Sequence, residues 1–470
     1  MNGCIAWEPV VGLEIHVQLK TRTKMFCRCS TGFGAEENTH TCPVCLAHPG
    51  ALPVPNRAAV EWTVKLGVAL GSEIAERAVF HRKNYFYPDN PKGYQISQYD
   101  EPLCVGGSLT VPGDEPFEVG FVRAHLEEDA AKTVHVGGGT GRKVGAERSL
   151  IDFNRGGTPL VEIVTQPDIH SAGQAERFLQ LLRQTIVELG ISDARMEEGT
   201  LRCDANVSVR PEGSDELRTR WELKNMNSFR FIGRGIAAAV REQVTLYESG
   251  GAVEQHTYDY EPDTDKLTPH RSKEEAEDYR YFPEPDLVPL EPEPELVERL
   301  RLALPELPAA KINRFSELVG LQAAEELVLT GNAEKAELLA VEGVPWVAAA
   351  SASMNELSNA NVSLQNAKEL ARVFNVKSEI PREALTAAIE ASQKEGFTAD
   401  PFIAERAVSD TAELEPVIDA ILAANPGQVA AYQGGKEGLL GFFVGQVMKE
   451  TGGRANPKVV NELVREKLRA

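Results

Sequence analysis

The stretch VGLEIHVQLK, residues 11–20, alternates strictly between apolar and polar positions. This period of two predicts a β-strand with one apolar and one polar face. The polar positions carry a carboxylate, an imidazole, an amide and an amine, from Glu14, His16, Gln18 and Lys20. A strand with one face in water is the simplest explanation of such a pattern.

Similar β-type runs recur through the first half of the chain, among them FEVGFVRAHL, PLVEIVTQ and ANVSVRP. Helical periodicity covers residues 175–189 and 233–247 between them. The strands follow one another at hairpin-like spacing and not as regular strand–helix–strand units. This order predicts an α+β domain with a β-rich sheet that is mixed or antiparallel.

The pattern changes near residue 283. Seven prolines fall between residues 283 and 308, and such a stretch forms neither a continuous helix nor a central strand. We interpret it as a linker or wrapping segment. Beyond residue 309, Ala, Leu and Glu recur at helical spacing with breaks at NVKSEIP and ANPG. The predicted domains are therefore 1–292, followed by two small all-α domains at 293–400 and 401–470.

The net charge of −21 argues against a protein that coats nucleic acid, although it leaves room for a local basic patch. The last 35 residues supply one, with seven Lys or Arg against four Glu. They are either a solvated helix face or a contact for a phosphate backbone. The candidate contacts are Lys436, Lys449, Arg454 and Lys458.

No apolar run approaches the ~20 residues that span a bilayer, so we expect no contact with a membrane. The first residues, MNGCIAWEPVV, have neither a basic region nor a clean apolar region, and we expect no signal peptide. Seven cysteines, an odd number without a secretion signal, predict reduced thiols in the cytoplasm.

Four of the cysteines form two close pairs, separated by twelve residues. Two thiolate pairs joined by a short loop suit tetrahedral zinc, and a site with four protein ligands is closed and structural. The first pair has one intervening residue, which is fewer than usual. The alternative is four unrelated reduced thiols. The predicted zinc ligands are Cys27, Cys29, Cys42 and Cys45.

Acidic side chains adjoin apolar β-type runs in four separate segments. If these segments converge, carboxylates with a little imidazole and amide suit Mg²⁺, which keeps waters and phosphate oxygens as further ligands. The chemistry would then be phosphoryl transfer. The chain has no GxxxxGK[ST] loop and no kinase signature, so an unusual fold would have to hold the nucleotide. The residues concerned are Glu14, His16, Glu127, Glu128, Asp204, Asn206, Glu222 and Lys224.

The segment RKNYFYPDNPKGYQISQYD, residues 82–100, holds four tyrosines and little apolar content. It is either a binding loop or a surface loop packed on its own aromatic side chains. As a binding loop it would offer Lys83, Tyr85 and Lys92 to a nucleotide, to which Asn206 and Lys224 of the acidic segments would be further contacts.

Taken in order, eight segments resemble the GatB family, the B subunits of tRNA-dependent amidotransferases. They are VGLEIHVQLKTRTKMFCRCS, CPVCLAHPGALPVPN, RKNYFYPDNPKGYQISQYD, HLEEDAAK, NRGGTPLVEIVTQPDI, EEGTLRCDANVSVRP, ELKNMNSFRFI and DYRYFPEPDLVPL. The resemblance covers nearly the whole chain.

The resemblance implies a cradle-shaped catalytic domain, a helical domain and a YqeY-like helical tail that meets tRNA. It implies a heterotrimer with a glutaminase A subunit and a small C subunit, acting on misacylated tRNA. Glu on tRNA(Gln), Asp on tRNA(Asn), or both would be converted to the amide with ATP. By similarity, Mg²⁺ would be held by His16, Glu128, Asp204 and Glu222, with Glu14 and Glu127 close by, and zinc by the four paired cysteines.

The residues fit this chemistry independently. A carboxylate is a poor acyl donor, but its phosphorylation gives an acyl phosphate that ammonia can attack in a water-poor chamber. The chain shows no GxSxG motif, and Cys104 and Cys203 have no obvious histidine partner. We therefore expect ammonia to come from a separate glutaminase.

Two other functions remain open. A non-catalytic tRNA-binding or scaffold module would need only the cysteines and the basic tail. A free-standing ATP-dependent ligase acting on a small carboxylic acid would use the same acidic cluster without tRNA and without the residues beyond about Asp400.

Overall fold

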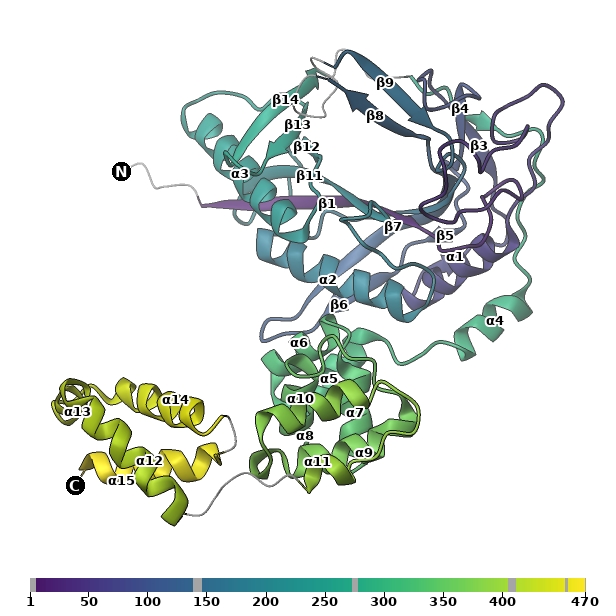
Figure 1. Cartoon of the computed structure of the whole chain (residues 1–470). Helices are drawn as coiled ribbons and strands as arrows, with labels where there is room; N and C mark the ends of the chain where they lie inside the picture. The colour runs from purple at the N-terminus through teal and green to yellow at the C-terminus, as the bar shows by residue number, and fades with distance from the viewer. Residues whose placement is uncertain (1–5, 138–145, 273–277, 405–410, 453–454, 470) are drawn as a thin grey trace. The chain divides into compact units, whose positions relative to one another are not determined.

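The computed structural model describes residues 6–137, 146–272, 278–404, 411–452 and 455–469. The chain divides into two compact units, Met1–Lys311 and Ile312–Ala470. The first unit contains the sheets, and the second is helical (Figure 1). The predicted α+β class is confirmed. The division into three domains stays a prediction, as does the boundary near residue 400.

A ten-stranded mixed sheet forms the centre of the first unit, in the order β14-β13-β12-β11-β1-β10-β7-β5-β2, with β6 paired to β7. All neighbouring strands are antiparallel except β12 and β13. The strands are β1 (Trp7–Gln18), β2 (Glu73–Ile74), β5 (Cys104–Val105), β6 (Ser108–Val111), β7 (Phe117–Glu128), β10 (Pro159–Thr165), β11 (Leu201–Pro211), β12 (Trp221–Lys224), β13 (His256–Glu261) and β14 (Lys266–Ser272).

Two smaller sheets complete the unit. One has the order β15-β3-β4, from Phe282–Pro283, Phe80–Asn84 and Tyr94–Gln98. The other pairs β8 (Lys132–Val136) with β9 (Arg148–Asp152). The first of these joins the predicted binding segment 82–100 to the beginning of the proline-rich stretch.

Three helices lie along one face of the large sheet: α1 (Arg57–Ala69), α2 (Ala172–Glu188) and α3 (Phe229–Glu248) (Figure 1). Each helix is preceded by a polar residue whose side-chain oxygen accepts a hydrogen bond from a backbone N–H of the first turn. These N-cap residues are Asn56, Ser171 and Ser228, in chain order. The apolar positions of β1 are at most 1% exposed from Val11 to Val17, whereas its polar positions are half-buried. The alternation of β1 therefore separates an apolar face from a polar one.

The proline-rich stretch contains one helix that the prediction did not include, α4 (Pro294–Leu302). It is possible because Pro294 occupies the first turn, where a missing N–H costs no helical hydrogen bond.

The remaining helices are short. They are α5 (Pro308–Val319), α6 (Leu321–Leu329), α7 (Ala333–Val341), α8 (Trp346–Met354), α9 (Leu364–Asn375), α10 (Arg382–Ala391), α11 (Asp400–Ile403), α12 (Thr411–Ala424), α13 (Pro426–Gln433), α14 (Leu440–Glu450) and α15 (Pro457–Arg469), with single 3₁₀ turns at Lys377–Glu379 and Glu437–Leu439. The last four α-helices share a core of their own around Ile418, Phe443 and Val464. No helix in the described part of the chain has the length and apolar character to cross a membrane.

Candidate active site

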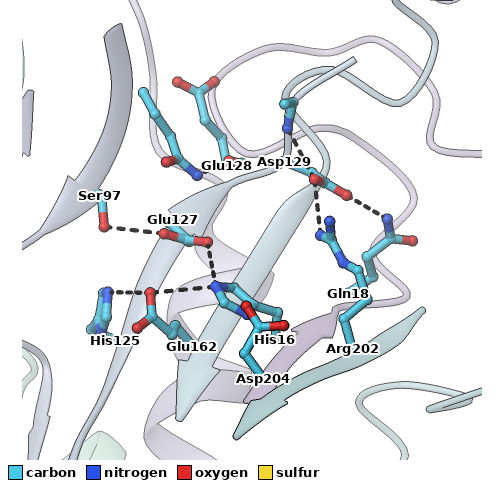
Figure 2. A network of polar contacts seen from close by, with 12 residues as sticks. His16, Gln18, Ser97, His125, Glu127, Glu128, Asp129, Glu162, Arg202 and Asp204 are labelled. Atoms are coloured by element: carbon cyan, nitrogen blue, oxygen red, sulfur yellow. Dashed lines mark hydrogen bonds and ion pairs between the residues drawn. The ribbon is translucent and has the colours of Figure 1, made fainter. Parts of the chain in front are cut away.

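A group of alternating imidazoles and carboxylates lies on the polar face of the three central strands (Figure 2). In the register of the sheet, His16 of β1 is opposite Glu162 of β10, and Glu162 is opposite His125 of β7. His16 Nε2 lies 3.5 Å from Glu162 Oε2 and 3.5 Å from Glu127 Oε1. His125 Nε2 lies 3.4 Å from the same Glu162 oxygen. Facing positions on antiparallel strands thus bring four titratable groups together.

Electrostatic interactions within this group are strong. Burial, the largest single effect, lowers the pKa of His16, but its contact with Glu162 and the charges of Glu127 and Glu162 raise the pKa to about 9. Burial raises the pKa of Glu162, yet His125 and His16 together hold it well below its ordinary value. The imidazolium of His16 is therefore favoured between two carboxylates.

His16, Glu127 and Glu162 offer one ligand atom each within 4.8 Å of one another, so these residues could hold a metal ion. Two carboxylates and an imidazole make a donor set that several divalent cations accept. The sequence reasoning missed Glu162. Its signal was an acid in the middle of PLVEIVT, where every neighbour from Pro159 to Thr165 is apolar or β-branched.

Glu128 points away from His16, because successive residues of a strand lie on opposite faces (Figure 2). It forms an ion pair with Lys92 and accepts the backbone N–H of Ile96 at 3.0 Å. It also lines a cavity of about 180 Å³ together with Cys27 and Cys45. The predicted nucleotide contact Lys92 and the predicted metal ligand Glu128 are thus bound to each other.

A second acidic group lies farther along the polar face. Lys224 Nζ donates to Asp204 Oδ2 at 2.6 Å and lies 2.9 Å from Glu222 Oε1. Nearby, Asn206 Nδ2 donates to Glu14 Oε1 at 2.9 Å. The four predicted magnesium ligands therefore fall into three groups in this structure. The ligand set stays a prediction.

Lys83 and Tyr85, the other predicted nucleotide contacts, are half-buried. Lys83 Nζ lies 4.8 Å from the centre of the Tyr279 ring. Burial, the largest effect, lowers the pKa of Lys83, but Glu127, Tyr281 and Glu162 together raise it above its usual range. This lysine therefore interacts electrostatically with the carboxylates that flank His16. Burial also raises the pKa of Tyr85 above its usual range.

A buried carboxylate next to Glu128 connects β1, β7 and β11. Asp129 accepts Gln18 Nε2 at 2.7 Å and Arg202 Nη2 at 2.9 Å (Figure 2). Because Arg202 is opposite His16 in the register, these bonds fix the end of β1 beside the histidine. The sequence offered no signal for this network, since its members are separated by more than 70 residues.

The four paired cysteines come together as predicted, and their four Sγ atoms all lie within 4.8 Å of one another. Cys42 Sγ and Cys45 Sγ are 3.8 Å apart, which matches the edge of about 3.8 Å that Zn–S bonds of ~2.3 Å give a tetrahedron. Contact with Cys27, the largest effect, lowers the pKa of Cys45 to about 4. Burial raises the pKa of Cys29 to about 11. The arrangement fits a tetrahedral metal ion.

Two family models together match most of the chain. Residues 9–298 match the model of the GatB/GatE catalytic domain, and residues 329–468 match that of the GatB domain. The chain belongs to the GatB family. It is 46% identical to the B subunit of the aspartyl/glutamyl-tRNA(Asn/Gln) amidotransferase of Geotalea daltonii, over 98% of this chain and 99% of the relative. Proteins of the same name from Anaeromyxobacter dehalogenans (47%) and Moorella thermoacetica (45%) match over 98% of this chain and 99% and 100% of their own.

The predicted tail contacts Lys436, Lys449 and Lys458 are exposed. Lys436 precedes the last 3₁₀ turn, Lys449 lies in the last turn of α14, and Lys458 lies in the first turn of α15. Arg454 lies outside the described residues. In this GatB-family chain, the three lysines are available to an anionic partner.

Proposed function

We propose that this chain supplies the kinase and transamidase activities of a glutamine-dependent tRNA amidotransferase. It would phosphorylate the side-chain carboxylate of Glu on tRNA(Gln), of Asp on tRNA(Asn), or of both, with ATP. It would then react the activated carboxyl group with ammonia from a glutaminase A subunit, held in a heterotrimer with a small C subunit. The observation that carries the proposal is the group formed by His16, Glu127 and Glu162, in a chain of this family.

Mg²⁺ would neutralise the charge that develops on the transferred phosphoryl group. His16, Glu127 and Glu162 lie together closely enough to hold it. Glu128, Asp204 and Glu222, which the resemblance implies as ligands, are paired with Lys92 and Lys224. A metal ion would compete with these ammonium groups for the same oxygens. The lysines would then be free to bind the phosphate groups of ATP, for which their charge suits them.

Other residues near this group would position and protect the substrate. Asp129, with Gln18 and Arg202, holds the end of β1 in place. Lys83, close to Tyr279, places a cation near the carboxylates and would attract the anionic substrate. The cysteine group, with zinc, would be structural, because all four coordination positions are taken by protein.

The proposal is tested with the chain purified together with its A and C subunits, glutamine, ATP, Mg²⁺ and misacylated tRNA. We expect the wild-type complex to form amides on Glu-tRNA(Gln), Asp-tRNA(Asn) or both. The variants His16→Ala and Glu128→Ala should lose tRNA-dependent ATP cleavage and keep glutaminase activity in the partner. Lys20→Ala, an exposed position at the end of the same strand face, is the control.

Three outcomes would contradict it. Wild-type activity in both variants would mean that neither the polar face nor Glu128 serves catalysis, as in a tRNA-binding or scaffold module. Release of ammonia from glutamine by the chain alone would overturn the division of labour within the heterotrimer. Turnover of a small carboxylic acid without tRNA, unaffected by loss of the tail, would identify a free-standing ligase.

A further inference from the structure

Lys24 is fully buried at the base of the cysteine group, with 0% of its surface exposed. Its ammonium Nζ donates to the carbonyl of Phe153 at 3.0 Å and lies 3.7 Å from Cys45 Sγ. Among the described residues it has no carboxylate partner within 4.0 Å, although a buried ammonium without an opposite charge is costly. The nearest group able to carry a negative charge is therefore a cysteine sulfur.

The backbone around Lys24 is part of the same structure. Its N–H donates to the carbonyl of Cys29 at 3.0 Å, and the N–H of Met25 donates to Gly157 at 2.7 Å. Gly157 has a φ of +86°, and a Cβ there would lie 3.4 Å from Lys24 Cδ and 3.8 Å from Cys45 Cβ. The lysine stem is thus enclosed between the cysteine loop and the residues before β10, so the ammonium cannot turn to solvent without a rearrangement.

The position of the Lys24 ammonium can be explained by the charge of the four-cysteine site. Four thiolates around a divalent cation carry a net charge of −2, which is unfavourable in a partly buried site. One ammonium 3.7 Å from a sulfur partly neutralises that charge. Partners outside the ligand shell commonly change metal affinity by about 10- to 100-fold.

We propose that Lys24 is the built-in counter-cation of the four-cysteine metal site and sets how tightly that site holds its metal ion. The proposal goes beyond the amidotransferase function and does not depend on it. It assigns Lys24 a positioning and charge-balancing role, in which its ammonium acts on the metal through the Cys45 sulfur.

The test measures metal affinity in the full chain, by competition with a chromophoric chelator for Zn²⁺ and by the absorption spectrum of bound Co²⁺. Lys24→Met removes the charge, Lys24→Gln keeps a donor for the Phe153 carbonyl, and Lys24→Arg keeps the charge. We expect the Met and Gln variants to bind Zn²⁺ about 10-fold or more weakly, and the Arg variant to remain closer to wild type. Lys20→Met, which removes an exposed lysine, should bind as wild type does.

A double-mutant cycle with Cys45→Ser separates charge from packing. In that background Lys24→Met should have little further effect on the residual affinity, because the sulfur next to the ammonium is gone. Equal losses in both backgrounds would show a packing defect and overturn the proposal, as would wild-type affinity in Lys24→Met. If Lys24→Met does not fold, the Zn²⁺ affinities of Lys24→Gln and Lys24→Arg are compared instead. Equal Zn²⁺ affinities in these two would also overturn it.

Discussion

At the scale of single residues, Glu162 links the two histidines of the candidate site because its strand lies between theirs in the sheet. It contacts His16 on one neighbouring strand and His125 on the other. The sequence analysis predicted His16 and Glu127 from their polar surroundings but passed over Glu162, because a lone acid in an apolar run does not reveal which strands flank it. It also could not tell whether Glu127 or Glu128 faces His16, since that depends on which face of β7 is covered.

A change of Glu162 to Gln should therefore weaken the site without unfolding the sheet. It removes a carboxylate from His16, and we expect tRNA-dependent ATP cleavage in the complex to fall by about 10- to 100-fold. The Mg²⁺ concentration for half-maximal rate should rise as well. Glu162→Asp should restore part of both effects, and Glu118→Gln, on an exposed part of β7, should change neither. An unchanged Mg²⁺ dependence would mean that Glu162 is only a packing partner.

The protonation of His16 has a consequence for stability. Its pKa in the folded protein, about 9, is above its ordinary 6.5. The stability that its charge contributes is therefore fully present below pH 6.5 and is lost as the pH rises through 9. Without metal, wild type should lose about 3 kcal/mol more than His16→Gln between pH 6.5 and 9.5. Denaturant titrations of both proteins measure this difference. Parallel pH dependences would contradict it.

At the scale of elements, the two-residue strand β15 shows how the start of the proline-rich stretch is attached to the first unit, by pairing with β3 and by an ion pair next to it. Glu284, whose side chain is fully buried, receives two bonds of 2.7 Å from Arg82 of β3. The prolines of this stretch predicted either a linker or a wrapping segment. The partner could not be predicted, because Arg82 and Glu284 are about 200 residues apart and neither stands out locally.

Breaking this pair should cost far more than breaking an exposed one. Glu284→Gln leaves the guanidinium of Arg82 with only the more exposed Asp286, 3.3 Å away, as a charged partner, and we expect a loss of about 3 kcal/mol in the free energy of unfolding. Glu101→Gln, in the exposed pair with Arg77, should cost less than about 1 kcal/mol. Chemical denaturation of the two variants makes the comparison. Equal losses would mean that burial does not set the strength of the Arg82 pair.

At the scale of the whole molecule, the sequence predicted the fold class and the order of the β-rich and helical parts along the chain better than it predicted how the strands are arranged in the sheet. The change of pattern near residue 283 indicated where the sheets end, and the cysteine spacing alone predicted a cluster that the structure contains. The order of strands in the large sheet was not predictable. Its central strands come from residues 7–18, 117–128, 159–165 and 201–211, and many pairings of such strands bury equal apolar area.

The basic residues of the tail permit a test of their predicted role. If Lys436, Lys449 and Lys458 contact phosphates of tRNA, changing each to Ala should weaken binding and reduce the salt dependence of affinity by about one unit of slope per lysine. Binding to tRNA at several salt concentrations measures both. Lys467→Ala is the control, because its ammonium is paired with Asp419 at 2.7 Å. An unchanged slope would leave these lysines as a solvated surface.

The central place of β1 also has a consequence for synthesis. The strand is made first, but its two neighbours end at residues 165 and 211. At roughly 5–20 residues per second, about 10–40 s pass before the second neighbour leaves the ribosome. Both edges of β1 remain unpaired until β10 emerges, and one edge remains unpaired until β11 does, which invites non-native pairing. The nascent chain therefore depends on protection from aggregation until β11 emerges, and only then can His16 enter its place in the sheet.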